Sequence, residues 1–60
     1  MPDFVDLLRK LLVAEYGKTE EEAAALVKKH TKIVVNGIMA WNVHATAMAI
    51  EMAEEGLPTE

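Results

Sequence analysis

The beginning of the chain carries apolar side chains at the spacing of one helix face. They recur at intervals of three and four positions: Phe4, Leu7, Leu8, Leu11 and Leu12. Such spacing is typical of an amphipathic helix with one buried side. Asp3 is a favoured residue at the start of a helix, and Gly17 is a favoured residue just beyond its end. The pattern therefore predicts a helix over about residues 3–16.

A second amphipathic segment follows Gly17. Thr19 and Glu22 have the three-residue spacing of a capping box, in which each side chain binds the other residue's backbone N–H. Apolar residues and a histidine then line one side, and lysines line the other: Ala23, Leu26, Val27 and His30 against Lys28, Lys29 and Lys32. We expect a helix over about residues 20–30, with its histidine at the edge of the core and bonded to a carbonyl group.

The rest of the apolar pattern is long and must be broken somewhere. Residues 20–55 contain no proline, so the pattern alone would allow one helix of about 54 Å, which is too long for a compact small domain. One place for a break is the polar, β-branched junction around Thr31, and the other is the Asn36-Gly37 pair, a strong hairpin signal.

A hairpin at Asn36-Gly37 is the less favoured of these two breaks. It would need two strands standing alone, over residues 32–35 and 38–41, and these segments lack the alternation of apolar and polar residues. We therefore expect the break near Thr31. A third helix is then predicted over about residues 32–55, closed by Gly56 with Pro58 beyond it.

Together these segments predict an all-α fold in a single domain over residues 1–60. The expected architecture is a compact three-helix bundle with helices over about 3–16, 20–30 and 32–55. A chain of 60 residues without cysteine has a limited core and no disulfide to strengthen it. Oligomerisation is the remaining source of extra stability. A single bent long helix in a dimer is the main alternative.

Two groups of residues lie on different sides of the expected third helix, because successive residues turn by about 100°. One broad arc is expected to face the core: Val35, Ile38, Met39, Asn42, Ala45, Thr46, Ala49, Ile50 and Ala53. A second stripe mixes small, aromatic and polar residues: Gly37, Ala40, Trp41, His44, Met48 and Glu51. A large rigid ring flanked by small residues and a polar rim suits contact with another protein.

We interpret this second stripe as a partner-binding surface. Its partner would be another folded protein, or a second copy of the chain in a homodimer with Gly37 at the close crossing. The open alternative is that Trp41 covers the core of the monomer. If His44 packs beside Trp41 at an interface, its protonation at mildly acidic pH would place a charge in the contact and weaken binding. A solvated surface histidine is the alternative interpretation of His44.

The charge of the chain argues against nucleic acid as a partner. The net charge is −4, which opposes binding to a phosphate backbone. Lysines cluster near residues 28–32, as in a helix-turn-helix, but the following helix has Val34, Val35 and Ile38 where side chains would read bases. A DNA-binding helix-turn-helix is therefore the least favoured function.

Residue types also bear on catalysis and metal binding. The chain has no serine and no cysteine, so the commonest nucleophiles are absent and we expect no enzyme. His30 and His44 have no second histidine or cysteine at chelating spacing. We therefore expect no metal ion and no other cofactor.

The two ends of the chain carry little further information. The first residues lack the pattern of an export signal, and no apolar stretch approaches the length of a membrane span. The default expectation is a soluble protein of cytoplasmic or recombinant origin with no membrane partner. Acidic residues near the other end are expected to be solvated: Glu51, Glu54, Glu55 and Glu60.

Three features resemble the small helical scaffolds, taken from short bacterial proteins of uncharacterised role, that are redesigned as binders. They are the capped opening MPDFVDLLRKLL, the helix TEEEAAALVKKH, and the lone Trp41 set among Gly37, Ala40 and His44. The resemblance covers the whole chain in style and no specific motif. It implies an engineered origin, a protein partner and no enzyme. Antibody-binding three-helix modules are one such class, with the antibody Fc region as partner, but the residues of their motif are absent here and none is carried over.

Overall fold

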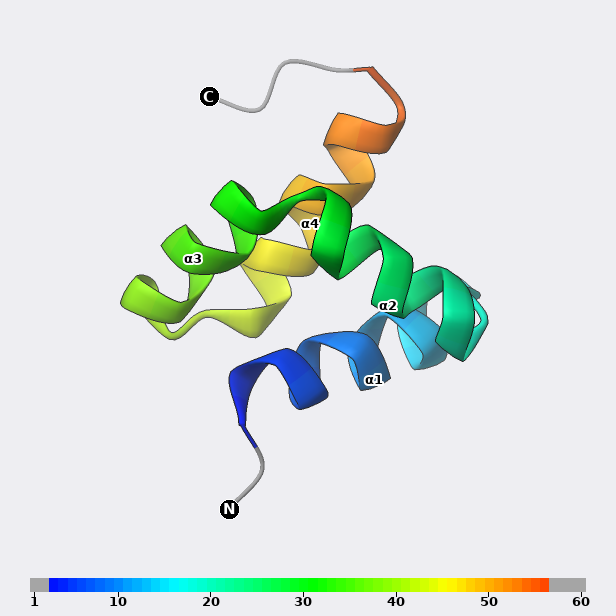
Figure 1. The fold of residues 1–60 in the computed structure, drawn as a ribbon, viewed down its shortest axis with the longest axis horizontal. Coiled ribbons are helices and arrows are strands. Elements are labelled where there is room, and N and C mark those ends of the chain that lie inside the picture. Colours follow the sequence, from blue (N-terminus) through cyan, green and yellow to red (C-terminus); the bar gives the residue numbers. More distant parts are fainter. Residues whose placement is uncertain (1–2, 57–60) are drawn as a thin grey trace.

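Four helices make up residues 3–56, the part of the chain that the computed structural model describes (Figure 1). They are α1 (Phe4–Tyr16), α2 (Glu20–Lys29), α3 (Thr31–Ala40) and α4 (Val43–Glu54). The all-α class and the compact shape are confirmed, with a Cα radius of gyration of 10.3 Å. The expected count of three helices is wrong, because the helix predicted over residues 32–55 is divided into α3 and α4.

The boundaries of α1 and the start of α2 follow the local signals in the sequence. The Asp3 side chain accepts a hydrogen bond from the backbone of the first turn of α1, and Gly17 ends that helix with a left-handed φ of 67°. The capping box is formed, since the Thr19 hydroxyl accepts from the Glu22 N–H at 3.0 Å and the Glu22 carboxylate accepts from the Thr19 N–H at 2.9 Å. These predictions are confirmed.

The break between α2 and α3 lies where the sequence predicts it. His30 alone separates the two helices, with a non-helical φ of −107° and ψ of 50°. The Thr31 hydroxyl donates to the Lys28 carbonyl at 2.9 Å across this bend. Asn36 and Gly37 lie inside α3, so the hairpin is excluded.

A second break, which the sequence pattern did not predict, divides α3 from α4. Trp41 adopts the left-handed conformation with φ 51° and ψ 47°. Its N–H donates to the Ile38 carbonyl at 3.1 Å, and the Asn42 N–H donates to the Gly37 carbonyl at 3.2 Å, which closes α3. The Asn42 side chain then accepts from the Ala45 N–H at 3.1 Å and starts α4. The prediction of one long third helix is therefore wrong, because Trp41 ends α3 and Asn42 begins α4.

The core lies where the helices meet. In Figure 1, α1 runs along the lower edge, α2 lies to the right, α3 lies to the left, and α4 passes behind them. Helix α1 packs against both α2 and α4, and α3 packs against α4. The buried apolar side chains come from all four helices: Phe4, Leu8, Leu12, Ala23, Val34, Ala47 and Ile50. Most of these side chains are small or medium in size, so the chain has only a thin hydrophobic core.

Ion pairs join the last turns of α4 to residues that follow α1 and to residues at the end of α2. Glu54 Oε2 lies 2.9 Å from Lys29 Nζ and 2.7 Å from His30 Nε2, and Glu51 Oε1 lies 3.4 Å from Lys18 Nζ. The expectation of a solvated acidic end is therefore wrong for Glu51, which is half-buried, whereas Glu54 and Glu55 are exposed and Glu60 lies outside the described residues. The partner of His30 is a carboxylate and not the carbonyl that was expected.

No helix within residues 3–56 combines the length and the apolar character needed to cross a membrane.

Candidate functional site

The six residues expected to form one partner-binding stripe do not share a face. Their common face required a continuous helix, and the chain turns at Trp41 and Asn42 instead. Gly37 is buried against α4, where an added Cβ would stand 2.9 Å from the Cβ of Thr46 and closer still to its Oγ1. Ala40 is exposed at the end of α3. The surface that Gly37 meets thus belongs to the same chain.

His44 and Met48 lie on the side of α4 that faces away from α3. Thr46 is the residue of α4 that contacts Gly37 on α3. His44 and Met48 are two positions to either side of Thr46, which places each about 200° around the helix from it. Both are exposed. Glu51 is half-buried and paired with Lys18, so it does not extend this surface as a free carboxylate.

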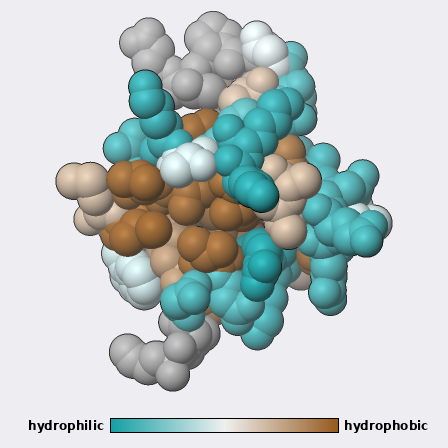
Figure 2. Space-filling view, viewed as in Figure 1, coloured by the Kyte–Doolittle hydropathy of each residue, from teal (hydrophilic) through white to brown (hydrophobic). Residues whose placement is uncertain are grey.

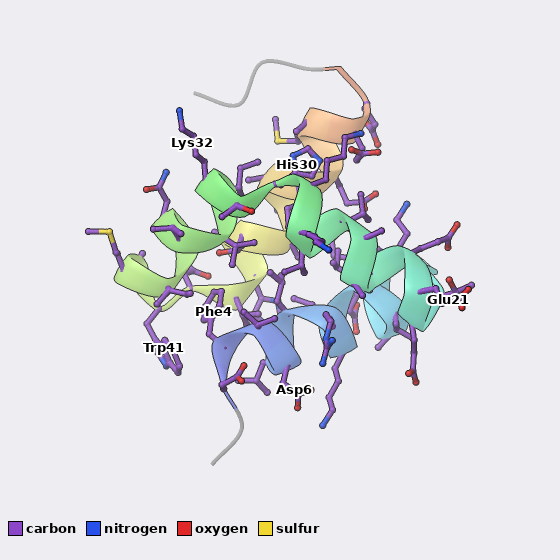
Figure 3. The ribbon with its side chains drawn as sticks, viewed as in Figure 1. Phe4, Asp6, Glu21, His30, Lys32 and Trp41 are labelled. Atoms are coloured by element: carbon purple, nitrogen blue, oxygen red, sulfur yellow. The ribbon has the colours of Figure 1, made fainter. Side chains whose placement is uncertain are left out.

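Trp41 contacts the core and is also exposed to solvent. Its ring lies 5.2 Å from the ring of Phe4, centre to centre, with the two planes tilted by 49° (Figure 3). Phe4 is 4% exposed, whereas Trp41 is 63% exposed. Trp41 therefore covers one end of the core with part of its ring and presents the remainder to solvent.

The outer side of α3 is apolar and unexpectedly exposed. Val35, Ile38 and Met39 are 47%, 42% and 80% exposed. Their spacing places them on one side of α3, opposite the buried Gly37. The core-facing role predicted for these three residues is wrong, because Val34 and Gly37 point inward in their place. We call Val35, Ile38, Met39 and Trp41 the α3 outer face.

Hydrophobic surface gathers over α3 and the adjoining part of α1, whereas hydrophilic surface covers α2 (Figure 2). Residues 33–50 contain no Asp, Glu, Lys or Arg. All the large hydrophobic residues that are exposed in residues 3–56 come from this stretch: Val35, Ile38, Met39, Trp41 and Met48. The α3 outer face is therefore both apolar and free of formal charge. Lys32 stands at its N-terminal border.

Other hollows of the described surface differ in their charge. Two shallow pockets are lined partly by ionisable side chains, one by Asp6, Arg9, Lys10 and Glu20 and the other by Lys18, Glu22, Lys29 and Glu54. A groove of about 290 Å³ between α3 and α4 has no ionisable side chain in its lining: Ile33, Asn36, Gly37, Ala40, Asn42, Ala45, Thr46 and Ala49. Within residues 3–56 no three His, Asp or Glu side chains come close enough together to hold a metal ion. The α3 outer face is thus the most distinctive surface of the described chain.

Sequence reasoning found only one member of this face, Trp41. A signal for the others was present, since a glycine inside a helix often marks the side where a neighbour approaches closely. Gly37 therefore pointed to the inward side of α3, and Val35 and Met39 lie opposite it. Comparisons with protein-family models, curated proteins and solved structures found no match to this chain.

Proposed function

We propose that this chain is a protein-binding module that docks through the α3 outer face. The observation that carries the proposal is the exposure of Val35, Ile38 and Met39 along one side of a helix that ends in a half-exposed tryptophan. Apolar residues at such spacing are the anchors by which a helix fits a groove on a partner. Tryptophan is enriched among the residues that dominate binding energy.

This surface differs from the stripe expected from the sequence. Trp41 is common to both, but His44 and Met48 point away from α3 and Gly37 is buried. The pH-sensitive contact through His44 is therefore not part of the proposal. The absence of charge from the α3 outer face also supports a protein partner. An uncharged apolar patch can be buried in a contact without the free-energy cost of removing charged groups from water.

A DNA-binding helix-turn-helix has less support. The lysines near the α2–α3 bend are Lys28, Lys29 and Lys32, and Lys29 is paired with Glu54. The exposed side of α3 carries Val35 and Met39 where a recognition helix would need hydrogen-bonding side chains.

Site-specific cross-linking tests the proposal. A photoreactive amino acid replaces Met39 in one variant and Glu21 in another, and both are expressed in the cells that contain the protein. Glu21 is exposed on α2, far from Trp41 (Figure 3). We expect a discrete protein adduct from position 39 and none from position 21, measured by gel shift and mass spectrometry.

A second substitution separates a specific contact from random collision. Ile38→Lys introduces a charge into the α3 outer face without filling the core, because Ile38 is already 42% exposed. The adduct from position 39 should then disappear while circular dichroism stays unchanged. Equal adducts from positions 39 and 21, or an adduct that survives Ile38→Lys, would contradict a binding role for this face.

A further inference from the structure

We propose, on the basis of the protein-binding function above, that the partner is a second copy of this chain. Two α3 outer faces would pack against each other antiparallel around a two-fold axis. A two-fold interface uses the same patch on both copies, so that patch must be complementary to itself. The α3 outer face meets this requirement in its charge and its geometry.

The charge distribution favours self-contact at this face. Each copy carries a net charge of −4, so two copies repel each other wherever acidic surfaces meet. The charged side chains are confined to residues 3–32 and to positions from Glu51 onward. Two copies that meet through the α3 outer face bring together a surface with no acidic side chain, bordered only by Lys32, and the acidic residues stay apart.

The geometry of α3 suits an antiparallel crossing midway between Val35 and Met39, on the side of the helix opposite the buried Gly37. Such a crossing places Val35 of each copy opposite Met39 of the other, with Ile38 close to the two-fold axis. Lys32 and Trp41 lie at opposite ends of α3 (Figure 3). The crossing therefore brings Lys32 of one copy to the Trp41 end of the other, where an ammonium group can lie over the exposed part of the indole ring.

The small size of the chain is a further reason to expect self-association. A standard interface buries about 800 Å² on each partner, which is roughly a fifth of the 4306 Å² that this chain exposes. The monomer has a thin core, and small domains of this kind commonly gain stability by oligomerisation. Covering Met39 and Trp41, which are 80% and 63% exposed, would extend the apolar core across the axis.

Molar mass in solution tests the inference with two matched variants. Sedimentation equilibrium of the full chain over a wide concentration range should show twice the 6.6 kDa monomer mass, with dissociation on dilution. Met39→Lys should weaken the dimer at least about 30-fold. Met48→Lys makes the same change at a methionine that is 56% exposed on α4, and it should leave the dimer unchanged.

Mixing two variants tests the antiparallel pairing itself. Met39→Lys and Val35→Glu should each be monomeric alone, because a charge would face an apolar residue of the other copy. In the mixed dimer the new lysine of one copy would face the new glutamate of the other. The mixture should therefore recover a dimer that contains one of each variant, detected by native mass spectrometry.

The outcomes distinguish this inference from the function on which it rests. A 6.6 kDa mass at every concentration, or a dimer that Met48→Lys disrupts and Met39→Lys does not, overturns the second copy as partner. Cross-linking from position 39 to a different protein would then support the binding function alone. A cross-link from position 39 with twice the chain mass would support both.

Discussion

Gly37 within α3 and Trp41 just beyond its end both have a backbone conformation that is unfavourable for their residue type. Gly37 sits in an ordinary helix, where an alanine would be favoured by about 1 kcal/mol, and it is tolerated because Thr46 leaves no room for a Cβ. Trp41 adopts a left-handed conformation that costs a non-glycine residue about 1–2 kcal/mol. The contact of its ring with Phe4 offsets this cost. The close α3–α4 crossing and the position of the tryptophan thus depend on two single residues.

Replacing Gly37 by alanine should destabilise the fold in spite of the better helix propensity. The added methyl group must displace Thr46, which is buried. Overpacking of this kind costs about 1–3 kcal/mol. The better helix propensity offsets about 1 kcal/mol of this cost, so we expect the free energy of unfolding, measured by urea denaturation, to fall by up to about 2 kcal/mol.

A double-mutant cycle with Thr46→Ala identifies the cause of this loss. Thr46→Ala removes Oγ1 and Cγ2, which are two of the three atoms nearest to the added methyl group. The cost of Gly37→Ala should therefore be smaller in the Thr46→Ala background than in the unsubstituted chain. An equal cost in both backgrounds would mean that the clash with Thr46 is not the reason for the glycine.

At the scale of the helices, the α3–α4 corner depends on one capping side chain. The Asn42 side-chain oxygen accepts the Ala45 N–H at 3.1 Å. Asn42→Ala should lower the free energy of unfolding by about 1 kcal/mol, whereas Asn42→Asp keeps an acceptor at the same place and should lower it by much less. Thermal melts of the three proteins check this. A similar loss in both variants would show that the cap contributes little.

Helix boundaries with local capping signals were predictable from the sequence, as Asp3, Gly17 and Thr19 show. The end of α3 was not, because tryptophan is a rare residue in the left-handed conformation. The usable signal was Asn42, a favoured first cap of a helix. The apolar periodicity runs across it without interruption, so periodicity alone joined α3 and α4 into one helix.

The candidate surface was harder to predict than the fold. Helix α3 is apolar around most of its circumference, so its periodicity does not say which side faces the core. The inward side is set by Thr46, nine positions beyond Gly37, and that pairing depends on the corner at Trp41. Trp41 itself was found because a lone tryptophan is a candidate anchor in any local structure.

At the scale of the whole molecule, the end of α4 is fastened to the bend between α2 and α3. Glu54 contacts both Lys29 and His30, which come from that bend. Helix α3 makes its main contacts with α4 and few with α2. The Glu54 cluster therefore helps to fix the direction in which α3 leaves α2, and with it the orientation of the α3 outer face.

This cluster should make stability depend on pH in the acidic range. The hydrogen bond from Lys29, and secondarily that from His30, lowers the pKa of the Glu54 carboxyl below its ordinary value of 4.5. A carboxyl whose pKa is lower in the folded state stabilises the fold above its unfolded pKa, and this contribution is lost as the pH falls through the folded pKa. Glu54→Gln should therefore reduce the melting temperature at neutral pH, and the difference from the unsubstituted chain should shrink as the pH falls from about 5 to about 2. Glu55→Gln is the matched control, because it removes the same charge from a neighbour that makes no ion pair with residues 3–56. A difference between Glu54→Gln and the unsubstituted chain that stays constant over this pH range would contradict the role assigned to the ion pair.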